Sequence, residues 1–254
     1  MILVTAGYDH SIKFWDVNTG MSTTNISYPD SHINKLAITN DRKYLGVAAH
    51  QVVKVYEISL SPNVAPSSEV SFEGHQGNIT ALGFQKDNKW FFTASEDGTL
   101  KIFDFKTSGY MRNFDNNSVM VNCAVLHPNQ GEIFFGDQSG RVRIWDLTEN
   151  NCKELYVDSK EEPFRSIAIS QSAKKLVAGN NIGMCFIWEQ NGSEYVPMQI
   201  LDAHPGHYIL KCQFSHDDQY LATASSDRTC VVWKLEVTEE VNPETTDAGV
   251  DHDV

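Results

Sequence analysis

A repeat with a period of 41 to 47 residues constrains the fold of this chain more than any other feature. Each alternating segment ends in an aromatic residue, and successive aromatics are separated by 41, 47, 42, 43 and 45 residues. Four short strands with their turns need roughly 40–45 residues. The sequence therefore predicts a series of similar four-stranded units. The aromatic residues are Trp15, Tyr56, Phe103, Trp145, Trp188 and Trp233.

Two finer spacings support the repeat. An apolar residue lies seven positions before the start of the next strand in five segments, at Ile38, Phe84, Leu126, Ile169 and Phe214. The second strand leads to the aromatic twelve residues later in every repeat but one, since the interval from Leu45 to Tyr56 is one residue shorter. Chance does not keep two spacings across this many copies, so these spacings are the strongest signal in the sequence.

The segments within a repeat predict an all-β fold. "ITALGF", "FRSIAI" and "ILKCQF" are typical of buried inner strands, and "GTLKIFDF" and "GRVRIWDL" alternate as strands with one buried face. A less regular fourth strand follows, for example at residues 153–157. Helix signatures are absent from the pattern.

An Asp lies six residues before the aromatic in three repeats, which predicts a tight turn between the second and third strands. An Asp at such a turn accepts hydrogen bonds from backbone N–H groups. Two repeats also have an upstream His, and we expect His, Asp, a strand Ser or Thr and the Trp N–H to form a buried chain. The residues predicted for these turns and chains are Asp9, Trp15, His75, Asp97, Trp145, Trp188, His204, Asp227 and Trp233.

The other repeats carry His50, Ser139 and Ile182 at the Asp position. We therefore expect those repeats to be stabilised by packing more than by polar chains.

The sequence resembles the WD-repeat β-propellers, through Gly74-His75 leading to "SEDGTLKIFD" and through the closures Trp15-Asp16 and Trp145-Asp146. The match covers residues 2 to about 235. A narrower resemblance is to the β-propeller subunits of the target-of-rapamycin (TOR) kinase complexes, carried by "ILVTAGYDHSIKFW", "EGHQGNITALGFQKDNKWFFTASEDGTLKIFD", "HPNQGEIFFGDQSGRVRIWDL" and "LATASSDRTCVVW". It implies seven antiparallel four-stranded blades, with the innermost strand of the first blade supplied from the C-terminus.

The chain departs from that pattern at both ends. Residues 2–17 look like the second and third strands of a blade whose innermost strand is missing, and no further repeat follows Trp233. We expect a propeller over residues 1–235 with about six blades visible of seven and incomplete ring closure. Two explanations stay open: a shortened form of a seven-bladed protein, or a strained six-bladed ring that lacks one inner strand.

Charge and composition exclude several classes of function. The net charge of −13 argues against a nucleic-acid-binding surface, which needs a basic face. Residues 236–254 hold seven carboxylates and no Lys or Arg, which is typical of a disordered acidic tail. The apolar stretch at residues 1–4 is too short for a signal peptide or membrane span. Five widely spaced cysteines without a CxxC motif indicate reduced thiols in a cytoplasmic protein.

The resemblance implies a non-catalytic scaffold that binds and stabilises the catalytic domain of TOR kinase beside the other TOR complex subunits, without nucleic acid, small-molecule substrate or direct membrane insertion. Loops on a rigid scaffold usually carry such contacts. The residues just before the inner strands should gather at one end of the ring. The expected partner-binding residues are Tyr8, His10, His32, Asn78, Met120 and Tyr208, with Pro163 at the equivalent position.

A β-propeller fold is also compatible with two other classes of function, an enzyme and another kind of adaptor. An enzyme is disfavoured: Pro205-Gly206 interrupts the only close His pair (His204 and His207), Asp97 and Asp137 lie in turn registers, and neither standard phosphate-loop spacing is present. No cofactor or metal is therefore expected. Another WD-repeat adaptor, such as a Gβ-like signalling subunit or a ubiquitin-ligase receptor, has the same fold. Such proteins usually bring an additional coiled-coil helix or adaptor-binding domain, which this sequence does not show.

Overall fold

The computed structural model describes all residues except 1, 29–30, 59–66, 108, 158–160 and 236–254. The described residues form 22 β-strands and no α-helix, which confirms the all-β prediction. In that part of the chain, no helix is long and apolar enough to cross a membrane. The acidic tail predicted for residues 236–254 lies outside the described residues.

The strands form six antiparallel sheets, named blades 1 to 6 in chain order. Blade 1 contains β1 (Ile2–Ala6), β2 (Ser11–Asp16) and β3 (Met21–Ser27). Blade 2 contains β4 (Ile33–Ile38), β5 (Tyr44–Ala49), β6 (Val52–Glu57) and β7 (Ser67–Glu73). Blade 3 contains β8 (Ile79–Phe84), β9 (Trp90–Ser95), β10 (Thr99–Asp104) and β11 (Tyr110–Asp115). Blade 4 contains β12 (Val121–Leu126), β13 (Glu132–Asp137), β14 (Val142–Asp146) and β15 (Asn151–Leu155). Blade 5 contains β16 (Phe164–Ile169), β17 (Lys175–Asn180), β18 (Met184–Asn191) and β19 (Glu194–Asp202). Blade 6 contains β20 (Ile209–Phe214), β21 (Tyr220–Ser225) and β22 (Cys230–Lys234).

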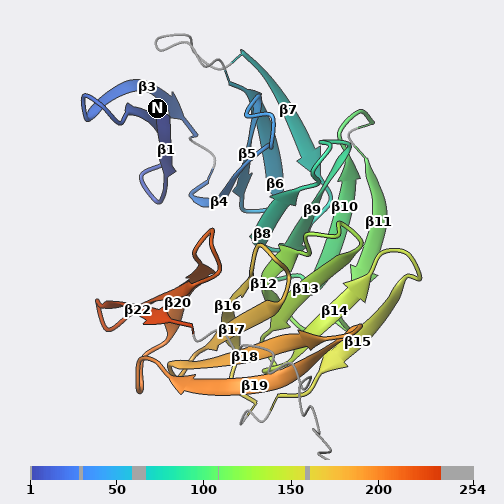
Figure 1. The fold of residues 1–254 in the computed structure, drawn as a ribbon. Helices are drawn as coiled ribbons and strands as arrows, with labels where there is room; N and C mark the ends of the chain where they lie inside the picture. Colours follow the sequence, from blue (N-terminus) through green and yellow to red (C-terminus); the bar gives the residue numbers. More distant parts are fainter. Residues whose placement is uncertain (1, 29–30, 59–66, 108, 158–160, 236–254) are drawn as a thin grey trace, which may run out of the picture.

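The blades follow one another around a common centre, as in a β-propeller (Figure 1). The strands nearest that centre are β4, β8, β12, β16 and β20, which we call the inner strands. Among the described residues, blade 1 has only β1, β2 and β3, and β1 pairs with β2 as the second strands of the other blades pair with the third. Its inner strand is therefore the one that is missing from this part of the chain. The sequence prediction for residues 2–17 is confirmed.

Both sequence spacings correspond to cross-strand pairs. The seven-residue spacing joins opposite residues of the first and second strands, for example Phe84 and Phe91. The twelve-residue spacing joins the second strand to the aromatic of the third, as in Leu3 with Trp15 and Leu221 with Trp233. A fixed loop length sets the pairing register of an antiparallel hairpin, so equal spacings reproduce the same blade.

The buried side chains of the described residues form five clusters, and each cluster lies between two successive blades. Between blades 2 and 3, Phe72 contacts the edges of Phe91 and Phe103, whose rings stack at 5.2 Å. Burying a large apolar side chain stabilises a fold by about 1.5–3 kcal/mol. The blades are therefore held face to face by apolar packing along the chain.

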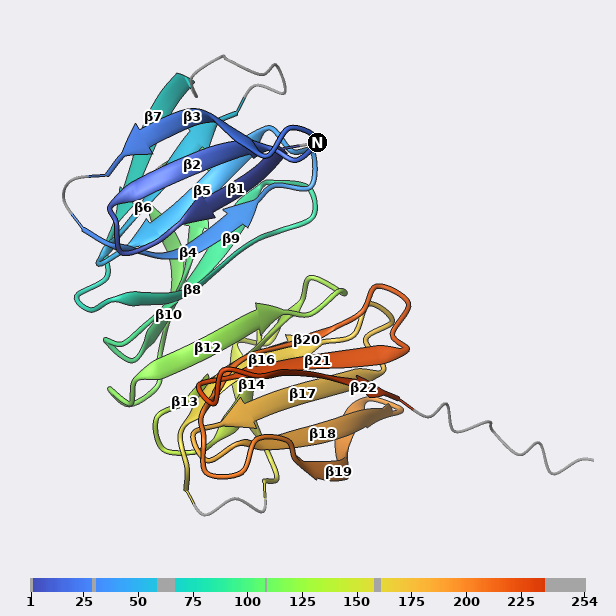
Figure 2. The same cartoon turned by 90° about the vertical axis from the view of Figure 1, so that its left-hand side faces the viewer.

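The ring is open between blades 1 and 6. No sheet or buried cluster of the described residues contains strands from both blades. Figure 2 shows blade 1 above and blade 6 below without a strand between them. Incomplete closure is as predicted, and the described residues do not form a closed six-bladed ring.

Candidate partner-binding site

The loops that precede the inner strands meet at one end of the ring, called the mouth here. The ring of Tyr8, from the β1–β2 turn, stacks on that of His32 with centroids 4.7 Å apart. His32 directly precedes β4, and Tyr208 precedes β20 on the far side of the opening. Tyr8 is 80% exposed and Tyr208 is 46% exposed, so both rings are available to a partner.

A β-bulge shapes the start of every inner strand. The pairing register shifts after the first residue of β4, β8, β12, β16 and β20. A bulge leaves its extra residue outside the ladder and turns its side chain in a new direction. The residues at the five bulges are Asn34, Thr80, Asn122, Arg165 and Leu210.

Two bulge side chains connect neighbouring blades. Asn34 donates from Nδ2 to the carbonyl of Ile79 at 3.3 Å, and Thr80 donates from Oγ1 to the carbonyl of Val121 at 2.6 Å. The inner strands β4, β8 and β12 are therefore fixed relative to one another just below the mouth, which keeps the surface above them rigid.

Two depressions at the mouth share part of their lining and so form one continuous surface. The first, about 290 Å³, extends from Tyr8 and His32 across the starts of β4 and β8. The second, about 480 Å³, extends to Arg165 and Tyr208. Both are lined by Thr80, Glu96 and Asn122. Aromatic rings thus flank a polar floor.

The polar floor is itself ordered by hydrogen bonds. Asn78 donates from Nδ2 to Glu96 at 2.8 Å, and its Oδ1 lies 2.8 Å from Nδ1 of His50. Arg165 donates from Nε to Asn181 at 3.1 Å. Preorganised polar groups between aromatic anchors are typical of protein-binding surfaces.

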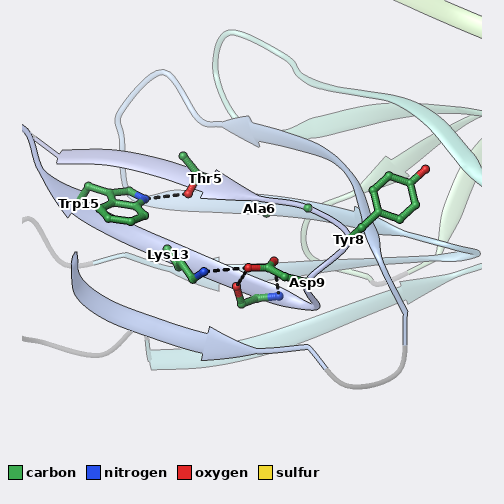
Figure 3. A pocket seen from close by; sticks show the side chains of 8 residues that line it. Thr5, Ala6, Tyr8, Asp9, Lys13 and Trp15 are labelled. Atoms are coloured by element: carbon green, nitrogen blue, oxygen red, sulfur yellow. Dashed lines mark hydrogen bonds and ion pairs between the residues drawn. The ribbon is translucent and has the colours of Figure 1, made fainter. Parts of the chain in front are cut away.

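A third depression, about 360 Å³, lies on blade 1 beside the mouth (Figure 3). Trp15 donates from Nε1 to Thr5 at 2.7 Å, and Lys13 forms an ion pair with Asp9 at 2.8 Å. Hydrogen bonds from Lys13 and Ser11 lower the pKa of Asp9 to about 2. Asp9 occupies the predicted turn, where it accepts from the Ser11 N–H at 3.3 Å.

The predicted polar chain is complete in blade 6. Nδ1 of His204 lies 2.7 Å from Asp227, and its Nε2 lies 2.9 Å from Thr223. Trp233 donates from Nε1 to the same Thr223 hydroxyl at 3.1 Å. The four side chains link the loop before β20 to β21, to the β21–β22 turn and to β22.

Blade 3 has a shorter chain, because its closing aromatic is Phe103 and has no N–H group. His75 lies 2.9 Å from Asp97 and 2.7 Å from Thr93. The two carboxylate oxygens of Asp97 also accept from the backbone N–H of Gln76 and of Thr99, at 2.9 and 2.8 Å. One carboxylate therefore connects the loop before β8 to the β9–β10 turn.

Trp145 and Trp188 are buried but stand outside such chains. Their Nε1 groups donate to Asn150 and to the carbonyl of Tyr156, both at 3.1 Å. The prediction that these two residues belong to such chains is therefore wrong, because no His–Asp pair among the described residues of blades 4 and 5 connects to their indoles.

The expectation that blade 4 relies on packing was also wrong. Asp137 is fully buried and accepts from the N–H and hydroxyl of Ser139 at 2.9 and 2.7 Å. Asn116 donates to its second oxygen at 3.1 Å, and Arg143 lies 3.7 Å away. Sequence alignment missed this network because its carboxylate lies two residues before the aligned Asp position.

Tyr8, His32, Asn78 and Tyr208 are thus among the residues that line the mouth depressions. His10, Met120 and Pro163 are not among the lining residues of the described depressions. Met120 is nevertheless 47% exposed on the loop before β12. Sequence reasoning missed the bulge residues, which carry no distinctive residue type.

Within the described residues, no group of three His, Cys, Asp or Glu side chains is placed to hold a metal ion. Cys123, Cys185 and Cys212 are buried. Burial raises the pKa of the Cys123 thiol to about 12, which keeps it protonated.

Comparison with known proteins matches the model described as "WD domain, G-beta repeat" to residues 67–104 and 195–234. "Target of rapamycin complex subunit wat1" of Schizosaccharomyces pombe is 40% identical over 240 residues, which are 93% of this chain and 75% of that protein. "Target of rapamycin complex subunit LST8" of Saccharomyces cerevisiae is also 40% identical, over 93% of this chain and 78% of its own. "Protein LST8 homolog" of Dictyostelium discoideum is 42% identical, over 92% of this chain and 76% of its own length.

Among solved structures, a chain of "Crystal Structure of Mitotic Checkpoint Complex" superimposes with a TM-score of 0.78, covering 92% of this chain and 73% of that one. The two sequences are 16% identical, so this likeness concerns the propeller fold alone.

Proposed function

The chain belongs to the LST8 family of target of rapamycin (TOR) complex subunits, and on that premise we propose that it is a scaffold subunit of a TOR kinase complex. Its proposed role is non-catalytic: it binds the catalytic domain of the kinase and stabilises it, beside other subunits of the complex. The proposed location is the cytoplasm. The observation that carries the proposal is the 40% identity to two proteins named as TOR complex subunits over 93% of this chain.

The mouth is the surface that we assign to the kinase. Exposed aromatic rings at its two ends, Tyr8 and Tyr208, supply apolar area that loses little conformational entropy on binding. The floor between them offers amide and hydroxyl groups held by the inner-strand bulges. A rigid scaffold that presents such a surface needs no reacting group, and its effect on a partner is to fix the partner's geometry.

Binding of the intact TOR kinase from the same organism to the immobilised chain tests this assignment. Tyr8→Ala and Tyr208→Ala should each weaken binding about tenfold or more, as expected for aromatic anchors. Tyr110→Ala is the matched control, because Tyr110 is 53% exposed but lies on the outer strand β11.

The mouth would be rejected as the docking surface if Tyr110→Ala weakened kinase binding as much as the mouth substitutions do. It would also be rejected if neither mouth substitution weakened binding. Absence of any binding by the wild-type chain would reject the scaffold function itself.

A further inference from the structure

The inner strands differ in charge from the rest of the molecule. Asp and Glu outnumber Lys and Arg in the chain by 33 to 20. The five inner strands nevertheless contain no carboxylate, and their charged residues are the cations Lys35, Arg165 and Lys211. An acidic protein thus has positive charge concentrated around the centre of its ring.

Lys35 and Lys211 occupy equivalent positions. Each is the first residue after the bulge of its inner strand, paired with Ala48 on β5 and with Ala224 on β21. Equivalent positions on β4 and β20 lie at the same level around the ring axis, and these two strands flank the opening (Figure 1). The two ammonium groups are thereby directed to one level of the centre.

Neither lysine has a hydrogen-bond or ion-pair partner among the described side chains, whereas Lys13 and Lys101 each have one. Lys35 lines the mouth depression of about 290 Å³. Desolvation and the positive charge of Lys211 lower the pKa of Lys35, so the two ammonium groups repel each other in this environment. Both lysines are exposed, so their ammonium groups are open to an anion from solvent, and an anion between them offsets their repulsion.

We propose that the centre of the ring binds a small anion carrying phosphate groups, held between the ammonium groups of Lys35 and Lys211 with the guanidinium of Arg165 nearby. Charge-assisted hydrogen bonds from lysine and arginine are the usual means of binding phosphate oxygens. Asn34 and Asn122 lie at the bulges of β4 and β12. Each amide nitrogen donates one hydrogen bond, to the carbonyl of Ile79 and to Gln138 respectively, and has a second N–H for an anion. Glu96 lines both mouth depressions, one of them together with Lys35, and its carboxylate accepts a hydrogen bond from Asn78. The site shares Lys35 and Arg165 with the lining of the mouth, but its test does not require the kinase.

Calorimetric titration of the whole chain with sodium tripolyphosphate tests the site, with sodium chloride at matched ionic strength as the reference. The wild-type protein should bind tripolyphosphate, and its melting temperature should rise when the anion is present. Lys35→Met with Lys211→Met should weaken binding about a hundredfold, because each lost charge-assisted contact is expected to cost about tenfold. Without the anion, the same double variant should melt at or above the wild-type temperature, since an uncompensated repulsion is removed.

The matched control is Lys86→Met with Lys174→Met, two exposed lysines on turns. It should bind tripolyphosphate as the wild type does. Lys211 is exposed, so the single variant Lys211→Met can be tested even if the double variant folds poorly. It should weaken tripolyphosphate binding about tenfold. No wild-type binding beyond the sodium chloride reference, or equal loss in the control pair, would overturn the proposal.

Discussion

The Asp97 carboxylate joins parts of blade 3 that are distant in sequence. It contacts the ring of His75 and the hydroxyl of Thr99, and accepts two backbone N–H bonds. Its side chain is 12% exposed. Removing the carboxylate leaves several mostly buried donors without an acceptor, and each such group carries a desolvation cost.

Asp97→Ala should lower the free energy of unfolding by about 1–3 kcal/mol because of those unpaired donors. Chemical denaturation monitored by tryptophan fluorescence measures it. Asp202→Ala is the control, since Asp202 is exposed at the end of β19 and makes no described side-chain hydrogen bond. Equal destabilisation by both substitutions would contradict the structural role of Asp97.

The same carboxylate predicts a loss of stability in acid. Burial raises the pKa of Asp97, but hydrogen bonds from His75 and Thr99 outweigh that effect and hold it well below 3.8. A carboxylate with a depressed folded-state pKa stabilises the fold above its unfolded pKa, and the contribution disappears as the pH falls through the folded value. Stability should therefore decline below about pH 4. Asp97→Asn should make that decline shallower in urea unfolding between pH 6 and pH 3, and an unchanged slope would refute the assignment.

Turn residues were predictable where the repeat kept its spacing. Asp9, Asp97 and Asp227 each accept the N–H two residues later, because the same loop length imposes the same turn. Asp137 performs a similar task from the end of β13, two residues earlier. Aligning the repeats finds turns that have the same length and the same residue at the same position. It does not find a different position whose side chain accepts hydrogen bonds from the equivalent backbone N–H groups.

At the scale of elements, a buried hydroxyl connects blades 4 and 5. Tyr195 on β19 donates to the carbonyl of Ala173 at 2.5 Å, and its oxygen lies 3.1 Å from Nε2 of His127. Its ring packs edge-on against Phe134 with centroids 5.1 Å apart. The outer strand of one blade is thereby tied to the first hairpin of the preceding blade.

Tyr195→Phe should cost about 1–3 kcal/mol of unfolding free energy, because it keeps the ring packing but leaves a buried carbonyl and imidazole unpaired. Thermal unfolding of this variant can be compared with that of Tyr220→Phe, since Tyr220 is 40% exposed and makes no described side-chain hydrogen bond. A Tyr220→Phe shift as large as that of Tyr195→Phe would show that the hydroxyl contributes nothing.

The inner strands were predicted residue for residue at Ile79–Phe84, Phe164–Ile169 and Ile209–Phe214. Most residues of β8 and β16 are buried or half-buried, whereas β20, beside the opening, exposes Leu210, Lys211 and Gln213. In all three strands, apolar residues mark the limits. The outer strand predicted at 153–157 runs from Asn151 to Leu155, because it is mostly exposed and little in its pattern fixes its ends. The bulges could not be predicted, since the five bulge residues share no chemical property.

At the scale of the whole molecule, one architectural rule produces the candidate site. Every blade repeats the same order of strands, so every loop before an inner strand reaches the same end of the ring. That rule predicted the gathering of Tyr8, His32, Asn78 and Tyr208 from sequence, whereas the depth and polarity of the surface between them depend on the unforeseen bulges. The assignment of this surface to TOR kinase rests on family membership.

Affinity capture of the tagged chain from its own cells, with quantitative mass spectrometry of the eluate, tests that central claim most directly. If the chain is a TOR kinase scaffold, TOR kinase should be recovered at close to one molecule per molecule of the chain, and less should be recovered when Tyr8 and Tyr208 are both replaced by Ala. Recovery of the folded wild-type chain without the kinase would contradict it.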